Sequence, residues 1–407
     1  MKKVFGKKYL GGALLLSLSM CLTSCEDVLG HWEKPTPPEC TVTSISLDKT
    51  SLVLYIDGGE NTATLTPILV GSLGFNQVFF SSSRPWVATV DEFTGEVTAV
   101  GGGEATITAS IGDLYVDCEV KVYHKKHDIS TGNADIPANE RWEITGTSDT
   151  YKITIGDEAI AVLNGVTINS TTGSCIETSG TTGSNIILVD GTTNTMTTTK
   201  DDYAAINTAF GPLNILGQTK GTGKLVAKGG ASGAGIGGNK DNNSLAITIL
   251  GGEIEATGGQ YAAGIGSGDC TPSATGTSGG NITISGGKVT ATGGEKAAGI
   301  GTGYAQSGDA GKKPACGSIT IDKTVISVTA TRGSYALDPI GKGYNFGSPN
   351  EPFCGDIFFD TEKVAVSGQT GASAYSTAPT AGTYGGLTLT ISKTTYDNDT
   401  WTLTPAN

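Results

Sequence analysis

Residues 245–268 read LAITILGGEIEATGGQYAAGIGSG, and residues 280–303 read GNITISGGKVTATGGEKAAGIGTG. Related versions of the same unit precede them at 213–238 and follow them at 317–343. A unit that recurs at a nearly constant spacing cannot bury its own apolar face, so it must stack on its neighbours. The repeat therefore predicts a solenoid for this part of the chain.

Within each unit apolar and polar residues alternate with a period of two, which is typical of strands and not of helices. In NITISGGKVTAT (281–292) two alternating runs flank Gly286 and Gly287, which indicates two short strands joined at a corner. The segment AAGIG that follows indicates a third strand. Three short strands per turn predict a parallel β-helix, in which each strand pairs with its counterpart one turn along at about 4.8 Å. Counting the weaker units, we expect about seven turns over 129–368 and a C-terminal cap over 369–407.

The spacing between units grows toward the C-terminal end. The growth follows the closing isoleucine, where NKDNNS (239–244) becomes DCTPSATGTSG (269–279) and then YAQSGDAGKKPAC (304–316). Insertions at one fixed point of a repeat map to loops on one side of a solenoid, often its working side. We call this side the loop-bearing flank. The closing isoleucines, which we expect to form one interior column, are Ile176, Ile206, Ile236, Ile265, Ile300 and Ile340.

Charges on the outward positions support the same stacking. Lys224, Glu253 and Lys288 occupy the same place in three successive units. Unlike charges directly opposed on neighbouring strands are mildly favourable, so this column indicates a structural role.

The N-terminal segment indicates export. Lysines precede an apolar run from Leu10 to Cys21 that is too short to span a bilayer, and LTSC follows at 22–25. This order resembles the lipoprotein signals of bacteria, which implies a signal peptide over 1–24 and lipidation of Cys25. The acidic pair that follows Cys25 resembles the signals of lipoproteins displayed on the outer membrane surface. A proline-rich tether over 25–40 should be extended and stiff.

The amino-acid composition and charge exclude some classes of function for this chain. The chain of 407 residues contains 61 glycines, about twice the usual share, and only 16% charged residues. Its formal charge of −13 and the lack of a basic stripe argue against nucleic acid as a partner.

Residues 41–123 form a separate alternating region with turn residues between short apolar runs, which predicts a β-sandwich. The stretch SSSRPWVATVDEFTGEVTAVGGGEATITA (81–109) resembles the bacterial immunoglobulin-like group 2 family. The resemblance implies a spacer or adhesion module of surface proteins. Trp86 departs from the family pattern, and we expect it to pack at an edge or in the core.

The repeat region resembles glycine-rich right-handed β-helices of surface proteins, some of them adhesins. Its first half also resembles a calcium-dependent β-helix family that binds cellulose and pectin. KDDYAAINT (200–208) resembles the paired aspartates of polygalacturonases, but the histidines of this chain, His31, His124 and His127, all precede the repeats. A hydrolase needs several converging groups, so a polysaccharide lyase or glycoside hydrolase is only the alternative interpretation.

Two groups of candidate ligand-binding residues each have two possible interpretations. Asp201 and Asp202 could contribute to a Ca²⁺ site, or could lie in a solvated turn, because calcium needs six to eight oxygens. Tyr203, Tyr261 and Tyr335 recur near one place in their units, and an interrupted column of tyrosines could stack on sugar rings or cover the edge of a coil.

Cysteines and tryptophans indicate how the solenoid is held together. Cys316 and Cys354 each precede the glycine that opens a unit, so they should stack one coil apart within disulfide range. Cys40 with Cys118 is a second possible pair. Trp142 and Trp401 stand near the two ends of the solenoid, where caps are expected.

These observations predict an all-β chain, an immunoglobulin-like β-sandwich followed by a right-handed parallel β-helix. The expected function is a non-enzymatic, lipid-anchored outer-membrane protein that is exposed on the cell surface and contacts glycans or a surface protein. It touches the membrane through the anchor only and has no cofactor unless Ca²⁺ binds. A purely structural surface protein is a further alternative.

Overall fold

A computed structural model describes residues 39–57, 60–242, 244–271, 279–306, 314–344, 352–364, 379–393 and 399–406. The expected signal segment, Cys25 and most of the tether lie outside these described residues. Within them the chain is all-β apart from one turn of 3₁₀ helix, η1 (Ile129–Thr131), which confirms the predicted fold class. No helix in that part of the chain has the length and apolar character of a membrane span.

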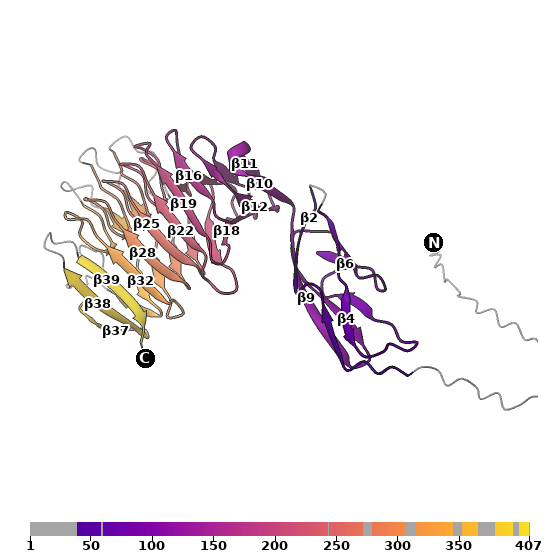
Figure 1. The fold of residues 1–407 in the computed structure, drawn as a ribbon. Coiled ribbons are helices and arrows are strands. Elements are labelled where there is room, and N and C mark those ends of the chain that lie inside the picture. Colours follow the sequence, from indigo (N-terminus) through magenta and orange to yellow (C-terminus); the bar gives the residue numbers. More distant parts are fainter. Residues whose placement is uncertain are drawn as a thin grey trace, which may run out of the picture.

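The N-terminal domain is a sandwich of short sheets around its own core (Figure 1). Alternation in β8 (Gly103–Ile111) buries every second side chain, among them Ile107. The four-stranded sheet has the order β2 (Ser51–Tyr55), β9 (Leu114–Tyr123), β8, β5 (Phe79–Ser82), the three-stranded sheet has the order β3 (Thr62–Thr64), β7 (Glu96–Ala99), β6 (Ala88–Val90), and β1 (Ser44–Leu47) pairs with β4 (Pro67–Val70).

The expectation that Trp86 packs at an edge or in the core is wrong. Trp86 is 69% exposed. It lies in the tight turn between β5 and β6, closed by the amide of Val87 donating to the carbonyl of Arg84 at 2.9 Å. The neighbouring side chain of Val87 is buried in the core, and the indole ring of Trp86 projects from the turn into solvent.

Three sheets of stacked strands run along the C-terminal domain, as a parallel β-helix requires (Figure 1). The first sheet contains β10 (Lys125–Asp128), β12 (Arg141–Thr145), β15 (Ile160–Leu163), β18 (Ser184–Leu188), β21 (Leu213–Gly217), β24 (Ile247–Ile249), β27 (Ile282–Ile284), β31 (Ile319–Ile321), β35 (Ile357–Phe359) and the antiparallel β36 (Glu362–Val364). The second contains β13 (Thr147–Ser148), β16 (Thr167–Ser170), β19 (Thr193–Thr198), β22 (Lys224–Lys228), β25 (Glu253–Thr257), β28 (Lys288–Thr292) and β32 (Ser327–Thr331). The third contains β11 (Ala134–Ile136), β14 (Ile153–Ile155), β17 (Ile176–Thr178), β20 (Ile206–Asn207), β23 (Ile236–Gly237), β26 (Ile265–Gly266), β29 (Ile300–Gly301) and β33 (Ile340–Gly341).

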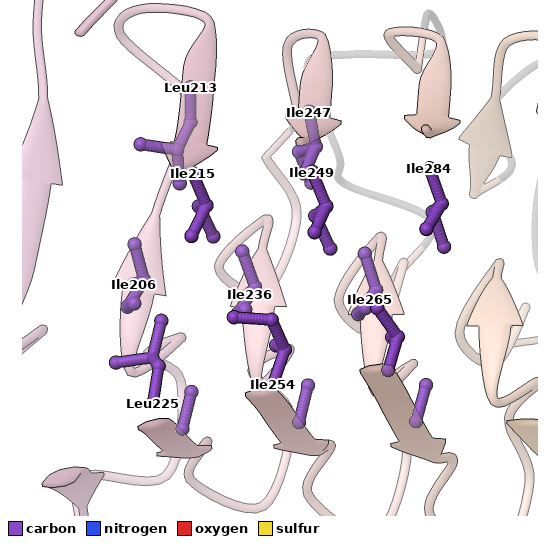
Figure 2. Close-up of a cluster of buried hydrophobic side chains, with 14 of the residues drawn as sticks. Ile206, Leu213, Ile215, Leu225, Ile236, Ile247, Ile249, Ile254, Ile265 and Ile284 are labelled. Atoms are coloured by element: carbon purple, nitrogen blue, oxygen red, sulfur yellow. The ribbon is translucent and has the colours of Figure 1, made fainter. Parts of the chain in front are cut away.

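Equivalent residues stack in register and fill the interior. In the third sheet Ile236 pairs with Ile265, and Ile265 with Ile300, so the predicted isoleucine column is confirmed. Figure 2 shows parallel columns from the other two sheets converging on it, among them Ile249 and Ile254. These side chains are fully buried, so the core is one continuous stack of aliphatic groups along the solenoid.

The outward charge column is also confirmed. Glu253 pairs in register with Lys224 on one side and Lys288 on the other. Its Oε1 lies 3.2 Å from the Nζ of Lys288, while Lys224 turns toward Glu255 at 2.5 Å. These groups are half-exposed, so each pair contributes at most about 1 kcal/mol.

The solenoid begins earlier than the expected residue 129. β10 already pairs in parallel with β12, and the third sheet alone has eight strands, so there are more coils than the seven expected. The first coils lack the glycine-rich corners that mark the repeat.

Trp142, on β12, is buried beneath the ammonium of Lys125, which lies 4.4 Å from the ring centroid.

An antiparallel hairpin closes the other end. β39 (Asp399–Pro405) pairs with β32 and places the buried Trp401 beside Ala330. The hairpin partner of β39 is β38 (Leu387–Lys393), which is followed outward by β37 (Gly382–Tyr384). The direction of pairing reverses here, so the last parallel strand is covered.

The two domains meet through a small buried cluster. β9 runs into β10 across His124, and Tyr55 stacks on Tyr123 with ring centroids 5.7 Å apart. The hydroxyl of Tyr55 donates to Oε2 of the buried Glu143, whose Oε1 accepts from Asn164 at 2.7 Å. Side chains of the sandwich and of the first coils are thus joined directly.

Candidate ligand-binding flank

Two columns of side chains meet on the loop-bearing flank. One occupies the corner ahead of each strand of the third sheet, and the other lies four residues after each closing isoleucine. The amide of Tyr304 donates to the carbonyl of Tyr261, and that of Tyr344 donates to the carbonyl of Lys296, both at 2.8 Å. The columns therefore interleave. The first consists of Tyr203, Ser232, Tyr261, Lys296 and Tyr335, and the second of Lys240, Asp269, Tyr304 and Tyr344.

Four tyrosines from successive coils form a continuous group, which we call the tyrosine cluster: Tyr261, Tyr304, Tyr344 and Tyr335. Ring centroids are 5.8 Å apart between Tyr261 and Tyr304, and again 5.8 Å between Tyr304 and Tyr344, where the rings are stacked at 16°. Tyr335 lies 6.0 Å from Tyr344 and is tilted by 57°. These spacings are within the range of favourable aromatic pairs.

Exposure differs along the tyrosine cluster. Tyr335 is 55% exposed, Tyr261 and Tyr344 are partly exposed, and Tyr304 is 8% exposed. Burial raises the pKa of the Tyr304 phenol, against the opposing charge of Lys296. The cluster is thus a platform with one buried ring and three rings that can contact a ligand.

Lys296 lies over this platform. Its Nζ is 4.4 Å from the ring centroid of Tyr304, 5.2 Å from that of Tyr261 and 6.0 Å from that of Tyr344. An ammonium within about 6 Å of an aromatic face is attracted by the electrons of the ring. The flank therefore combines aromatic surface with a fixed positive charge.

A buried carboxylate lies beside the platform. Oδ2 of Asp269 accepts from Gln306 at 2.6 Å and from Ser232 at 3.4 Å. Its Oδ1 is buried without a hydrogen-bond partner among the described residues. Burial raises the pKa of the Asp269 carboxyl to about 6, against the lowering effect of the bond from Gln306.

The predicted tyrosines are not all brought together. Tyr261 and Tyr335 belong to the tyrosine cluster, but Tyr203 lies two coils before Tyr261, about 10 Å along the solenoid. Tyr203 lines a shallow polar cleft of about 290 Å³ with other residues. Those residues include the ion pair of Lys152 with Glu177 at 2.5 Å.

Asp201 and Asp202 lie on the exposed turn ahead of Tyr203. Oδ1 of Asp202 is 3.4 Å from the Nζ of Lys240. No group of three histidine, cysteine, aspartate or glutamate side chains able to hold a metal occurs within the described ranges. Calcium binding by the paired aspartates stays a prediction.

The structure joins Cys316 and Cys354 in a disulfide. β30 (Ala315–Cys316) pairs in parallel with β34 (Phe353–Cys354), which places the two Cα atoms 4.8 Å apart. This is the arrangement anticipated from their matching positions before a glycine.

The other possible disulfide is not formed. Cys40 is exposed and lies beside the β8–β9 turn at Gly112, whereas Cys118 is fully buried in the sandwich core. Cys118 lies four residues beyond Leu114 along β9, about 13 Å, which exceeds the Cα separation that a disulfide can bridge.

Sequence reasoning missed Tyr304, Tyr344 and the role of Lys296. A signal was present, because Gly-Thr-Gly-Tyr (301–304) and Gly-Lys-Gly-Tyr (341–344) stand at the same place after a closing isoleucine. Each column taken alone does not show the cluster, because the contact between the two columns depends on Tyr304 and Tyr344 bonding to the preceding coil at Tyr261 and Lys296.

Two family models match parts of this architecture. The family model of the bacterial immunoglobulin-like domain, group 2, matches residues 41–120, and the model of the β-helix repeat matches residues 247–269 and 282–304. Domains 4 and 5 of the S-layer protein SbsC match at 24% identity over 21% of this chain and 53% of that chain, with a TM-score of 0.17. This chain thus spans about half the length of that structure. No curated protein matches.

Neither of the two matched family models describes an enzyme family. An immunoglobulin-like domain followed by β-helix repeats is a surface-protein type of architecture, consistent with a non-enzymatic adhesion or structural role.

Proposed function

We propose that this chain is a non-enzymatic cell-surface protein, anchored in the outer membrane through lipid on Cys25, that contacts glycans through the tyrosine cluster. The observation that carries the proposal is the run of four tyrosine rings, each about 6 Å or less from the next, on the loop-bearing flank. The immunoglobulin-like domain acts as the spacer between membrane and solenoid.

A tyrosine platform suits a sugar because the ring face stacks on the apolar face of the pyranose while the phenol stays hydrated. Tyr335 is exposed and Tyr344 is partly exposed, so both offer ring surface to a ligand, and Tyr304 stacks on Tyr344. Binding a sugar in this way requires only ring surface and hydrogen-bonding groups, and no reactive group.

Binding to a panel of soluble polysaccharides, followed by native gel electrophoresis in polysaccharide-containing gels, tests this function. We expect retardation of the wild-type protein by at least one glycan. The double variant Tyr335→Ala/Tyr344→Ala should lose it, whereas the control Tyr151→Ala should not, because Tyr151 is 37% exposed but lies outside the cluster. Equal retardation of all three proteins would contradict a role for the cluster.

One observation favours a polysaccharide-degrading enzyme as second candidate. The exposed carboxylates of Asp201 and Asp202 directly precede Tyr203 and its cleft of about 290 Å³. New reducing ends or unsaturated products after incubation with pectin would support this activity. If neither binding nor product is detected, the result would favour a purely structural protein, or one whose partner is another surface protein.

The anchor has its own test. Mass spectrometry of the N-terminal peptide should find acyl groups on Cys25, and Cys25→Ser should move the protein from the membrane fraction to the soluble fraction. Protease treatment of intact cells should degrade the wild-type protein if it faces outward.

A further inference from the structure

Lys296 differs from the other lysines of the solenoid in what surrounds its charge. Its ammonium faces three tyrosine rings, and no carboxylate of the described residues lies within ion-pair distance of it. The solenoid lysines that do pair with a carboxylate include Lys152 with Glu177, Lys224 with Glu255, Lys240 with Asp202, Lys288 with Glu253 and Lys323 with Asp360.

Two acidic residues near the cluster, Glu295 and Asp269, have hydrogen-bond partners other than Lys296. Glu295, the preceding residue, accepts from Gln260 at 2.9 Å. Asp269 is buried and its Oδ2 accepts from Gln306 and Ser232. The ammonium of Lys296 is therefore held in position by aromatic faces, which attract it without neutralising its charge.

A fixed ammonium beside aromatic rings is complementary to a sugar ring that carries an anionic group. We propose that Lys296 and the tyrosine cluster form a subsite for an acidic polysaccharide, with the anionic group on the ammonium of Lys296 and the sugar ring against Tyr335 and Tyr344. This inference rests on the proposed glycan binding and specifies its ligand class. Both required features are present within one cluster, since the ring centroid of Tyr344 lies 6.0 Å from that of Tyr335 and 6.0 Å from the Nζ of Lys296.

The formal charge of −13 does not oppose this subsite at close range. At physiological ionic strength the Debye length is about 8 Å, so charges on distant coils are largely screened. Within the cluster itself the charged group is the ammonium of Lys296, which an anionic group of the ligand would contact directly.

Affinity electrophoresis of the full mature chain in gels containing polygalacturonate, dextran sulfate or neutral dextran tests the inference. We expect the wild-type protein to bind an acidic polymer more tightly than neutral dextran. Lys296→Met, which keeps most of the aliphatic stem, should weaken acidic binding roughly tenfold or more, because a charge-assisted contact is lost. Lys296→Arg should retain binding.

Lys228→Met is the matched control, because Lys228 is an exposed lysine of β22 in the second sheet, outside the cluster. It should bind as the wild type does. Thermal unfolding of each variant shows whether it is folded, and Lys296→Arg supplies a charged comparison if Lys296→Met unfolds. The two acidic polymers decide whether the anion is a carboxylate or a sulfate.

The outcomes separate the two proposals. Unchanged acidic binding in folded Lys296→Met, or binding of neutral dextran only, would overturn the acidic subsite and leave glycan binding by the tyrosines intact. Lack of binding to these polymers and to the broader panel would overturn both. Loss in Lys296→Met with retention in Lys296→Arg and Lys228→Met supports the subsite.

Discussion

Asp269 is a carboxyl group whose surroundings oppose its charged form. It is 2% exposed, only its Oδ2 has hydrogen-bond partners among the described residues, and burial raises the pKa of its carboxyl from 3.8 to about 6. The folded chain therefore keeps a proton between pH 4 and 6 that the unfolded chain has already released. By linkage this carboxyl supports folding below about pH 4, and that support is lost as the pH rises to 6.

We predict that Asp269→Asn is more stable than the wild type above pH 6, by up to about 3 kcal/mol, and about equal to it at pH 4. Asparagine cannot ionise and keeps an oxygen to accept from Gln306. Urea unfolding at several pH values between 4 and 8 measures the difference. An asparagine variant that is less stable than the wild type at pH 7.5 would show that the carboxylate is compensated in a way these contacts do not provide.

Glycine is required where coils approach most closely. Gly266, at the end of β26, has φ +134°, and a Cβ atom there would lie 1.9 Å from the carbonyl oxygen of Gly301 in the next coil. We expect Gly266→Ala to lower the free energy of unfolding by more than about 3 kcal/mol, because backbone strain and a clash combine.

Gly191→Ala is the control for Gly266→Ala. Gly191 has φ +74°, but nothing lies within 4 Å of a Cβ placed there. Only backbone strain remains, so the expected loss is about 1–2 kcal/mol. Similar losses in the two variants, measured by denaturant unfolding, would argue against close packing of the coils at Gly266.

At the scale of elements, each coil is stabilised by its neighbours and not by itself. A strand such as β26 has only two residues, and its hydrogen bonds go to the coils before and after it. The last coils have a parallel neighbour on one side only. Links that tie them to the stack should therefore matter most for stability there.

The Cys316–Cys354 disulfide is such a link. It closes a loop with a sequence separation of 38 residues, for which loop entropy predicts about 4 kcal/mol of stabilisation. We expect Cys316→Ser/Cys354→Ser to lower the midpoint of thermal unfolding and to hasten proteolysis after β33. Cys40→Ser, which changes an exposed cysteine of the sandwich, should do neither. If alkylation of the denatured protein adds the same mass with and without reductant, the bond is not formed in solution.

At the scale of the whole molecule, the domain junction decides how the solenoid is presented. Tyr55 of the sandwich donates to Glu143 of the solenoid, and the stacked Tyr123 lies beneath the guanidinium of Arg141 at 5.0 Å. Burial and the neighbouring carboxylate raise the pKa of the Tyr55 phenol, which keeps it a hydrogen-bond donor. We infer that the junction holds the two domains at a fixed angle.

Tyr55→Phe tests the junction because it keeps the ring but removes the donor to a buried carboxylate. The unpaired carboxylate oxygen should cost about 1–3 kcal/mol and loosen the domain contact. Small-angle scattering should then report a broader distribution of domain distances, and proteolysis between β9 and β10 should accelerate. The control Tyr115→Phe alters a tyrosine that is 70% exposed. Unchanged scattering and cleavage in Tyr55→Phe would mean that backbone pairing alone sets the angle.

The sequence by itself determined the periodic part of this protein. Parallel strands pair residue by residue, so equal positions in successive units must stack. This rule predicts the column Ile236, Ile265 and Ile300, the charges around Glu253, and the approach of Cys316 to Cys354. Each of these contacts follows from the regular spacing of equivalent residues, which can be read directly along the chain.

Only the tertiary structure decided which residues of different columns and of different domains meet. The backbone amides of Tyr304 and Tyr344 donate to carbonyls of the preceding coil, at Tyr261 and Lys296 respectively. Glu143 meets Tyr55 across 88 positions of sequence. Such convergence depends on the path of loops and on how two domains dock, and neither has a period. For the same physical reason, the repeat predicts the fold, whereas the contact of Tyr304 and Tyr344 with Tyr261 and Lys296 could not be predicted from it.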